Sequence, residues 1–170
     1  MPAANQPKGS VSTGSIKPVT RKAVRCQREV AWLVTQAAGK LVATTDDVNA
    51  PTPSFVLATA LSYTRKQEQA ARDRGAAIGH EAVMGPDLAS FCQAAGLPAA
   101  PNALSDAGYM FTLSGADLIR DLYAYCGDLG ERVGDATQVK PGYAIKLALR
   151  SFLLDDAAGN GATSADNASA

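Results

Sequence analysis

Histidine and cysteine, side chains that often act in catalysis or bind zinc, are scarce in this sequence. His80 is the single histidine, which excludes any zinc or catalytic site that needs two. The three cysteines, Cys26, Cys92 and Cys126, lie 66 and 34 residues apart and include no C-x-x-C pair. This spacing implies neither a disulfide framework nor a zinc site, so we expect no bound metal.

A row of carboxylates is the second group that could do chemistry. Asp117, Asp121 and Asp128 fall on a narrow stripe if the chain is helical from residue 114 onward. Such carboxylates could act as general acid and base or bind Mg²⁺, but acidic stripes also occur as solvated helix surface. The phosphate-loop motif G-x-x-x-x-G-K-[ST] and the motif G-x-G-x-x-G are both absent from the sequence. We therefore predict no enzyme activity and no cofactor, with an enzyme built on dispersed Cys, His and Asp residues as a remote alternative.

The strongest binding feature is a basic tract near the N-terminus. It has five positive charges and no acid in twelve residues, and its cations are Lys17, Arg21, Lys22, Arg25 and Arg28. On a helix, the three arginines share one side, and Trp32, the single tryptophan, projects on that side as well. Several cations on one tract suit phosphates, and an indole can stack on a base. We predict that these six residues bind single-stranded nucleic acid.

Composition and charge set the class of protein. The chain has 170 residues, enough for one domain, with 46% hydrophobic and 19% charged residues, which excludes fully disordered and membrane-spanning classes. The formal net charge is zero, but residues 1–75 carry 11 Lys/Arg and 5 Asp/Glu, and residues 76–170 carry 5 and 11. Such a two-ended chain could attract a polyanion or the opposite end of another copy. Alternatively, the two halves neutralise each other within one fold.

Apolar periodicity predicts the elements that must position these residues. Helices are expected over 20–42, from 52–54 to about 75, in a short segment after Pro86, over 114–127 and over 141–154. No stretch alternates apolar and polar residues convincingly over the length of a strand. We predict an all-α fold, a compact bundle of about five helices over residues 20–154, with residues 1–19 as a flexible arm and residues 155–170 as a disordered tail.

The last predicted helix is apolar on nearly every side. Such a helix is either central to the fold or covered by a partner. We predict that Tyr143, Leu147, Phe152 and Leu154 hold the body or a subunit interface. In the second case, Asp117, Asp121 and Asp128 would meet the basic segment of a neighbouring copy.

An arm, a helical body and a tail form a layout that resembles the coat proteins of filamentous viruses, which surround nucleic acid. The resemblance is one of layout, with no motif behind it. We predict a non-enzymatic structural or assembly protein that self-associates into a homo-oligomer and contacts nucleic acid through a basic N-terminal helix. The alternative is a helical adaptor or regulator that binds an acidic protein partner. No signal-peptide pattern is found, so we expect an intracellular or virion location and no membrane partner.

Overall fold

Six helices and a two-stranded sheet make up the part of the chain that the computed structural model describes, residues 17–44, 49–101, 108–133 and 139–162. In chain order they are β1 (Arg21–Gln27), α1 (Glu29–Thr44), α2 (Pro53–Asp73), α3 (Glu81–Met84), α4 (Leu88–Ala94), β2 (Gly108–Ser114), α5 (Ala116–Val133) and α6 (Pro141–Ala162). The predicted arm lies outside the described residues up to residue 16, and the predicted tail from residue 163.

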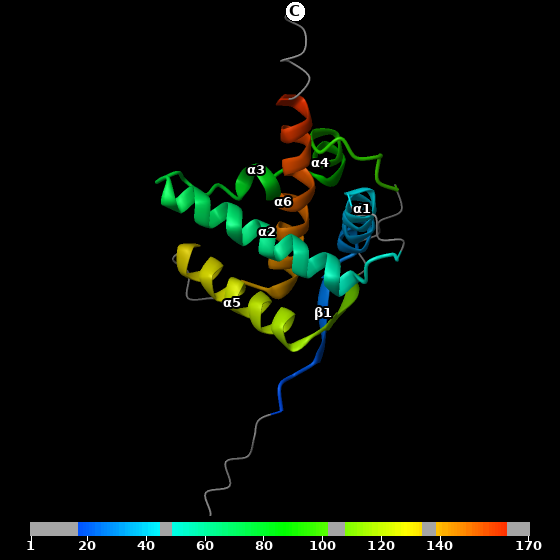
Figure 1. Cartoon of the computed structure of the whole chain (residues 1–170), viewed down its shortest axis with the longest axis vertical. Coiled ribbons are helices and arrows are strands. Elements are labelled where there is room, and N and C mark those ends of the chain that lie inside the picture. The colour runs from blue at the N-terminus through cyan, green and yellow to red at the C-terminus, as the bar shows by residue number, and fades with distance from the viewer. Residues whose placement is uncertain (1–16, 45–48, 102–107, 134–138, 163–170) are drawn as a thin grey trace, which may run out of the picture.

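Helix α6 lies at the centre of the fold. It contacts α1, α2, α3, α5 and β1, and in Figure 1 the other elements surround it. Its buried apolar residues are Ala144, Ile145, Leu147, Ala148, Leu149, Phe152 and Leu153. Of the two explanations for an almost wholly apolar helix, burial inside one molecule is therefore the one observed. Leu147 and Phe152 belong to the core, Leu154 packs against it half-buried, and Tyr143 is exposed.

The all-α prediction is wrong, because the fold contains an antiparallel sheet. β1 pairs with β2 in a register that runs from Arg21 opposite Ser114 to Gln27 opposite Gly108. The helix predicted from residue 20 begins only at Glu29, so most of the basic tract is strand. The basic N-terminal helix through which a nucleic-acid contact was predicted is therefore not present, since Arg21–Gln27 form a strand.

Burial explains why these residues form a strand. In β1 only Val24 and Cys26 are buried, two residues apart, and they face Phe111 and Tyr109 of β2. Two apolar positions are too few to show a period of two in sequence, and the same residues also fit a helical face. The backbone hydrogen bonds that select the strand come from β2, which lies far away in the chain.

Local capping fixes two helices near their predicted starts. Thr52 caps α2, where its side chain accepts a hydrogen bond from the Phe55 N–H, and Pro53 occupies the first turn. Asp87 caps α4 in the same way, with the Ser90 N–H as donor. At the other end of the chain, α6 continues to Ala162, into the segment predicted as a tail.

Candidate anion-binding surface

The solvent-facing side of β1 carries two arginines. Arg21, Ala23, Arg25 and Gln27 are exposed and alternate with the buried Val24 and Cys26. We call these four exposed residues the outer face of β1. Because strand residues rise about 3.3 Å each, Arg21 and Arg25 lie about 13 Å apart along the strand. The sheet therefore presents two guanidinium groups on one side to solvent.

The other cations of the basic tract are distributed around this face. Lys17 is exposed in the segment that leads away from β1 and from the helices (Figure 1). Lys22 projects toward the opposite side of the strand, where its Nζ lies 4.2 Å from the centre of the Tyr123 ring. Arg28 is exposed in the turn between β1 and α1. The tract is thus not a single row, because a strand sends successive side chains to opposite faces.

The structure does not place Trp32 on the outer face of β1. Trp32 lies in α1, where it is half-buried and packs against the hydrophobic core. The helical spacing that placed it beside Arg28 does not continue back into β1, since the strand ends at Gln27. The indole therefore contributes to packing in this molecule.

Neither Arg21 nor Arg25 has a carboxylate partner among the described residues. The ion pairs in that part of the chain involve other cations, at Arg65, Arg72, Arg120, Arg132, Lys146 and Arg150, and also His80. Glu29 and Glu68, two acids of the basic half, pair with cations of the acidic half. Although Arg65 of the basic half pairs with Asp128 of the acidic half, the contacts of Glu29 and Glu68 do not neutralise the excess positive charge of the first half. They remove acids that could have balanced it.

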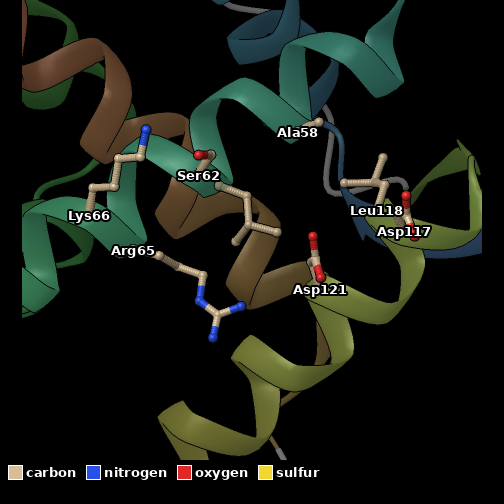
Figure 2. Close-up of a pocket in the computed structure, with 8 residues that line it drawn as sticks. Ala58, Ser62, Arg65, Lys66, Asp117, Leu118 and Asp121 are labelled. Carbon is tan, nitrogen blue, oxygen red and sulfur yellow. The ribbon is translucent and has the colours of Figure 1, made fainter.

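The acidic stripe on α5 is used within the molecule. Asp128 accepts a hydrogen bond from Arg65 of α2 at 3.0 Å, and Asp117 and Asp121 lie 3.1 and 3.3 Å from Arg120. Figure 2 shows Arg65 and Asp121 reaching from opposite helices into a groove of about 430 Å³ between α2 and α5. Each of these acids therefore has a cation of its own chain nearby. The structure of one molecule does not test the predicted contact with a neighbouring copy, which stays a prediction.

A buried carboxylate at Glu68 joins three segments of the chain. Its Oε1 accepts a hydrogen bond from the Tyr125 hydroxyl at 2.7 Å and lies 2.7 Å from His80 Nε2, and its Oε2 accepts from Arg132 at 2.8 Å. Burial raises the pKa of Glu68, but the hydrogen bonds with His80, Tyr125 and Arg132 outweigh this and lower the pKa to about 2. His80 thus contacts a structural ion pair, which the sequence did not reveal because its partners are distant.

All three cysteines are buried as free thiols. Burial raises the pKa of Cys26 and of Cys126 to about 11 and also raises the pKa of Cys92. With a pKa near 11, roughly one thiol in a thousand is ionised at pH 8. Within the described residues, no three His, Cys, Asp or Glu side chains gather where they could hold a metal ion.

These thiols give a test of the core. We expect the native protein to react with Ellman's reagent at pH 8 at least 100-fold more slowly than the protein in guanidinium chloride, because the reactive thiolates are scarce and covered. Absorbance of the released thiolate measures both rates. Fast labelling of even one cysteine in native buffer would contradict the burial described above.

Comparison of the chain with known protein families, curated proteins and solved structures finds no significant match. Among the described residues, no helix is both long and apolar enough to cross a membrane.

Proposed function

We propose that this chain is a non-enzymatic protein that binds single-stranded nucleic acid through the outer face of β1 and the cations around it. The observation that carries the proposal is that Arg21 and Arg25 project from one exposed face with no carboxylate partner among the described residues. Guanidinium groups in this position can donate to phosphate oxygens, and their planes can stack on bases that a duplex would conceal. Lys17 and Arg28 extend the positive surface at either end of the strand.

Self-association and an intracellular or virion location are secondary parts of the proposal. Of the residues predicted for a subunit interface, Leu147 and Phe152 are buried in the core and Asp128 pairs with Arg65. The proposed self-association therefore rests on the uneven distribution of charge between the two halves of the chain. An acidic protein surface would meet the same arginines, so an adaptor role is the competing outcome of the test below.

The test compares binding of a fluorescent oligothymidine by the wild type and by the double variant Arg21→Ala/Arg25→Ala. We expect the double variant to bind about tenfold or more weakly at low salt, because two charge-assisted contacts are lost. If Lys17, Arg21, Arg25 and Arg28 all contact phosphates, the slope of log K against log salt is roughly −2.8 for the wild type and about −1.4 for the variant. Fluorescence anisotropy across a salt series gives both quantities.

The matched control is Arg74→Ala/Arg120→Ala, which removes two exposed arginines elsewhere and should leave both affinity and slope close to wild type. An equal loss of binding in both double variants would show that only total charge matters and would reject the outer face as the site. Polyglutamate that binds more tightly than the oligonucleotide at equal charge would favour the acidic-partner alternative.

A further inference from the structure

A cavity of about 530 Å³ lies between β1 and the first turn of α6. Its walls include the polar side chains of Arg25, Gln27, Lys140 and Lys146, together with Met84 and Tyr143. This volume is within the range of small-molecule sites, and the combination of cations with apolar groups is of the kind that fixes a ligand's orientation. Arg25 belongs both to this cavity and to the outer face of β1, so the two surfaces are continuous.

Two glycines shape the cavity. A Cβ at Gly108 would lie 2.9 Å from Arg25 Nε, so the missing side chain lets the Arg25 guanidinium lie against β2. A Cβ at Gly142 would lie 2.7 Å from the carbonyl oxygen of Arg25, so this glycine lets α6 begin directly against β1. The absence of a side chain at Gly108 and at Gly142 thus lets Arg25 lie at the wall of the cavity.

The charge around the cavity is positive. Lys146 pairs with Glu29 and donates to Gln27 at 3.0 Å, but Arg150 also pairs with Glu29, so one carboxylate serves two cations. Lys140 is exposed and, like Arg25, has no carboxylate partner among the described residues. A phosphate group, whether the diester of a strand or the monoester of a mononucleotide, would therefore meet an excess of positive charge instead of competing with an existing ion pair.

The apolar side of the cavity suits a base. Tyr143 is 42% exposed at the edge of the cavity, although a tyrosine in a mostly buried helix could have packed inward. An accessible aromatic ring beside a phosphate site is the arrangement by which proteins stack the bases of single strands. Met84 and Val30 complete the apolar wall.

We propose that this cavity holds one nucleotide of a bound strand, with its phosphate at Arg25 and Lys140 and its base against Tyr143. This inference rests on the proposed function, because it assigns one unit of the strand to a defined place beside the outer face of β1. It also predicts, separately, that a mononucleotide alone binds in the cavity.

The test uses two probes, thymidine 5′-monophosphate followed by NMR and oligothymidine followed by anisotropy. We expect the mononucleotide to shift the amide signals of Gly108 and Gly142, which border the cavity, and thymidine without phosphate to leave them in place. Lys140→Ala should weaken both probes severalfold, and Tyr143→Ala should weaken oligothymidine at least fivefold, the lower end of the effect of removing one stacking ring. Lys66→Ala, an exposed lysine in the groove between α2 and α5, is the control and should bind both probes as the wild type does.

The outcomes separate the two proposals. If oligothymidine binding depends on Arg21 but is the same in wild type, Lys140→Ala and Tyr143→Ala, the cavity inference is overturned and the proposed function stands. If the mononucleotide shifts the cavity amides but oligothymidine does not bind, the cavity binds a nucleotide, but the proposed function and the placement of a strand's nucleotide there are both overturned. Absence of binding by both probes overturns both. Thermal unfolding of Tyr143→Ala establishes that the variant is folded. Lys140→Ala, at an exposed position, tests the cavity independently of any effect on folding.

Discussion

Replacing Arg150 by alanine is expected to lower the free energy of unfolding by about 3–5 kcal/mol. The Arg150 side chain is 1% exposed at the centre of α6, where its Nη1 donates to the carbonyl oxygens of Val83 and Pro86 at 3.0 and 2.8 Å. Its Nη2 lies 3.2 Å from Glu29, and its guanidinium lies 4.7 Å from the centre of the Phe91 ring. The alanine variant loses these contacts and leaves a cavity, because the Arg150 side chain is buried.

A second substitution separates the two effects. Arg150→Met retains most of the side-chain volume but still leaves the Val83 and Pro86 carbonyls without their donor. We therefore expect it to destabilise less than Arg150→Ala, by the contribution of the cavity. Arg120→Ala is the matched control, since this arginine side chain is 70% exposed and pairs only at the surface, where the expected change is below about 0.5 kcal/mol. Urea unfolding followed by circular dichroism measures all three, and equal stability of Arg150→Ala and Arg120→Ala would contradict the structural role of Arg150.

Replacing Glu68 by glutamine is expected to remove about 3 kcal/mol of stability at pH 7. The pKa of Glu68 is lowered from 4.5 to about 2, and this difference of 2.5 pH units corresponds to that free energy. The amide keeps the shape of the side chain but leaves the partly exposed Arg132 guanidinium without its negative partner. Glu68→Ala should cost more, since the Tyr125 hydroxyl then loses its acceptor as well.

The lowered pKa of Glu68 determines how the stability lost in Glu68→Gln changes with pH. Because the pKa of Glu68 is lower in the folded state, its contribution is fully present above pH 4.5 and is lost as the pH falls through about 2. The difference in unfolding free energy between wild type and Glu68→Gln should therefore shrink over this interval and vanish near its lower end. Urea unfolding at pH 7, 5, 4 and 3 measures this trend. A difference that stays constant with pH would show that the carboxylate charge is not what stabilises the contact.

The control for the pH series is Glu131→Gln. Glu131 is an exposed acid on the same helix as Tyr125, and its substitution removes an equal charge. We expect a change within about 0.5 kcal/mol at every pH, because a surface carboxylate has similar surroundings in the folded and unfolded chains.

Several helices were predictable for local reasons, although α3 was not predicted and the first helix was predicted to begin before Glu29. Thr52 and Pro53 identify the start of α2, Asp87 caps α4, and the apolar run after Pro141 identifies α6. These signals act within one or two turns of helix, so they can be recognised in sequence alone. The burial of α6 was one of two alternatives until packing against α1 and α2 decided between them.

The strands were not predictable, because their stability comes from each other. Val24 and Cys26 become the inner side of a strand only when Phe111 and Tyr109 are brought opposite them. The same dependence on distant partners hid Arg150, which meets Glu29 and Pro86, and Glu68, which meets Tyr125. Sequence spacing gives no measure of such contacts.

For the candidate site, the sequence by itself determined which charges are available: five cations between Lys17 and Arg28, with no acid among them. The tertiary structure decided where they point. It placed Arg21 and Arg25 on an exposed face, turned Lys22 toward Tyr123, kept Trp32 against the core and brought Lys140 to the same cavity as Arg25. The physical reason is that charge is a property of each residue, whereas orientation depends on whether the backbone is helix or strand, and here pairing with a distant strand made that choice.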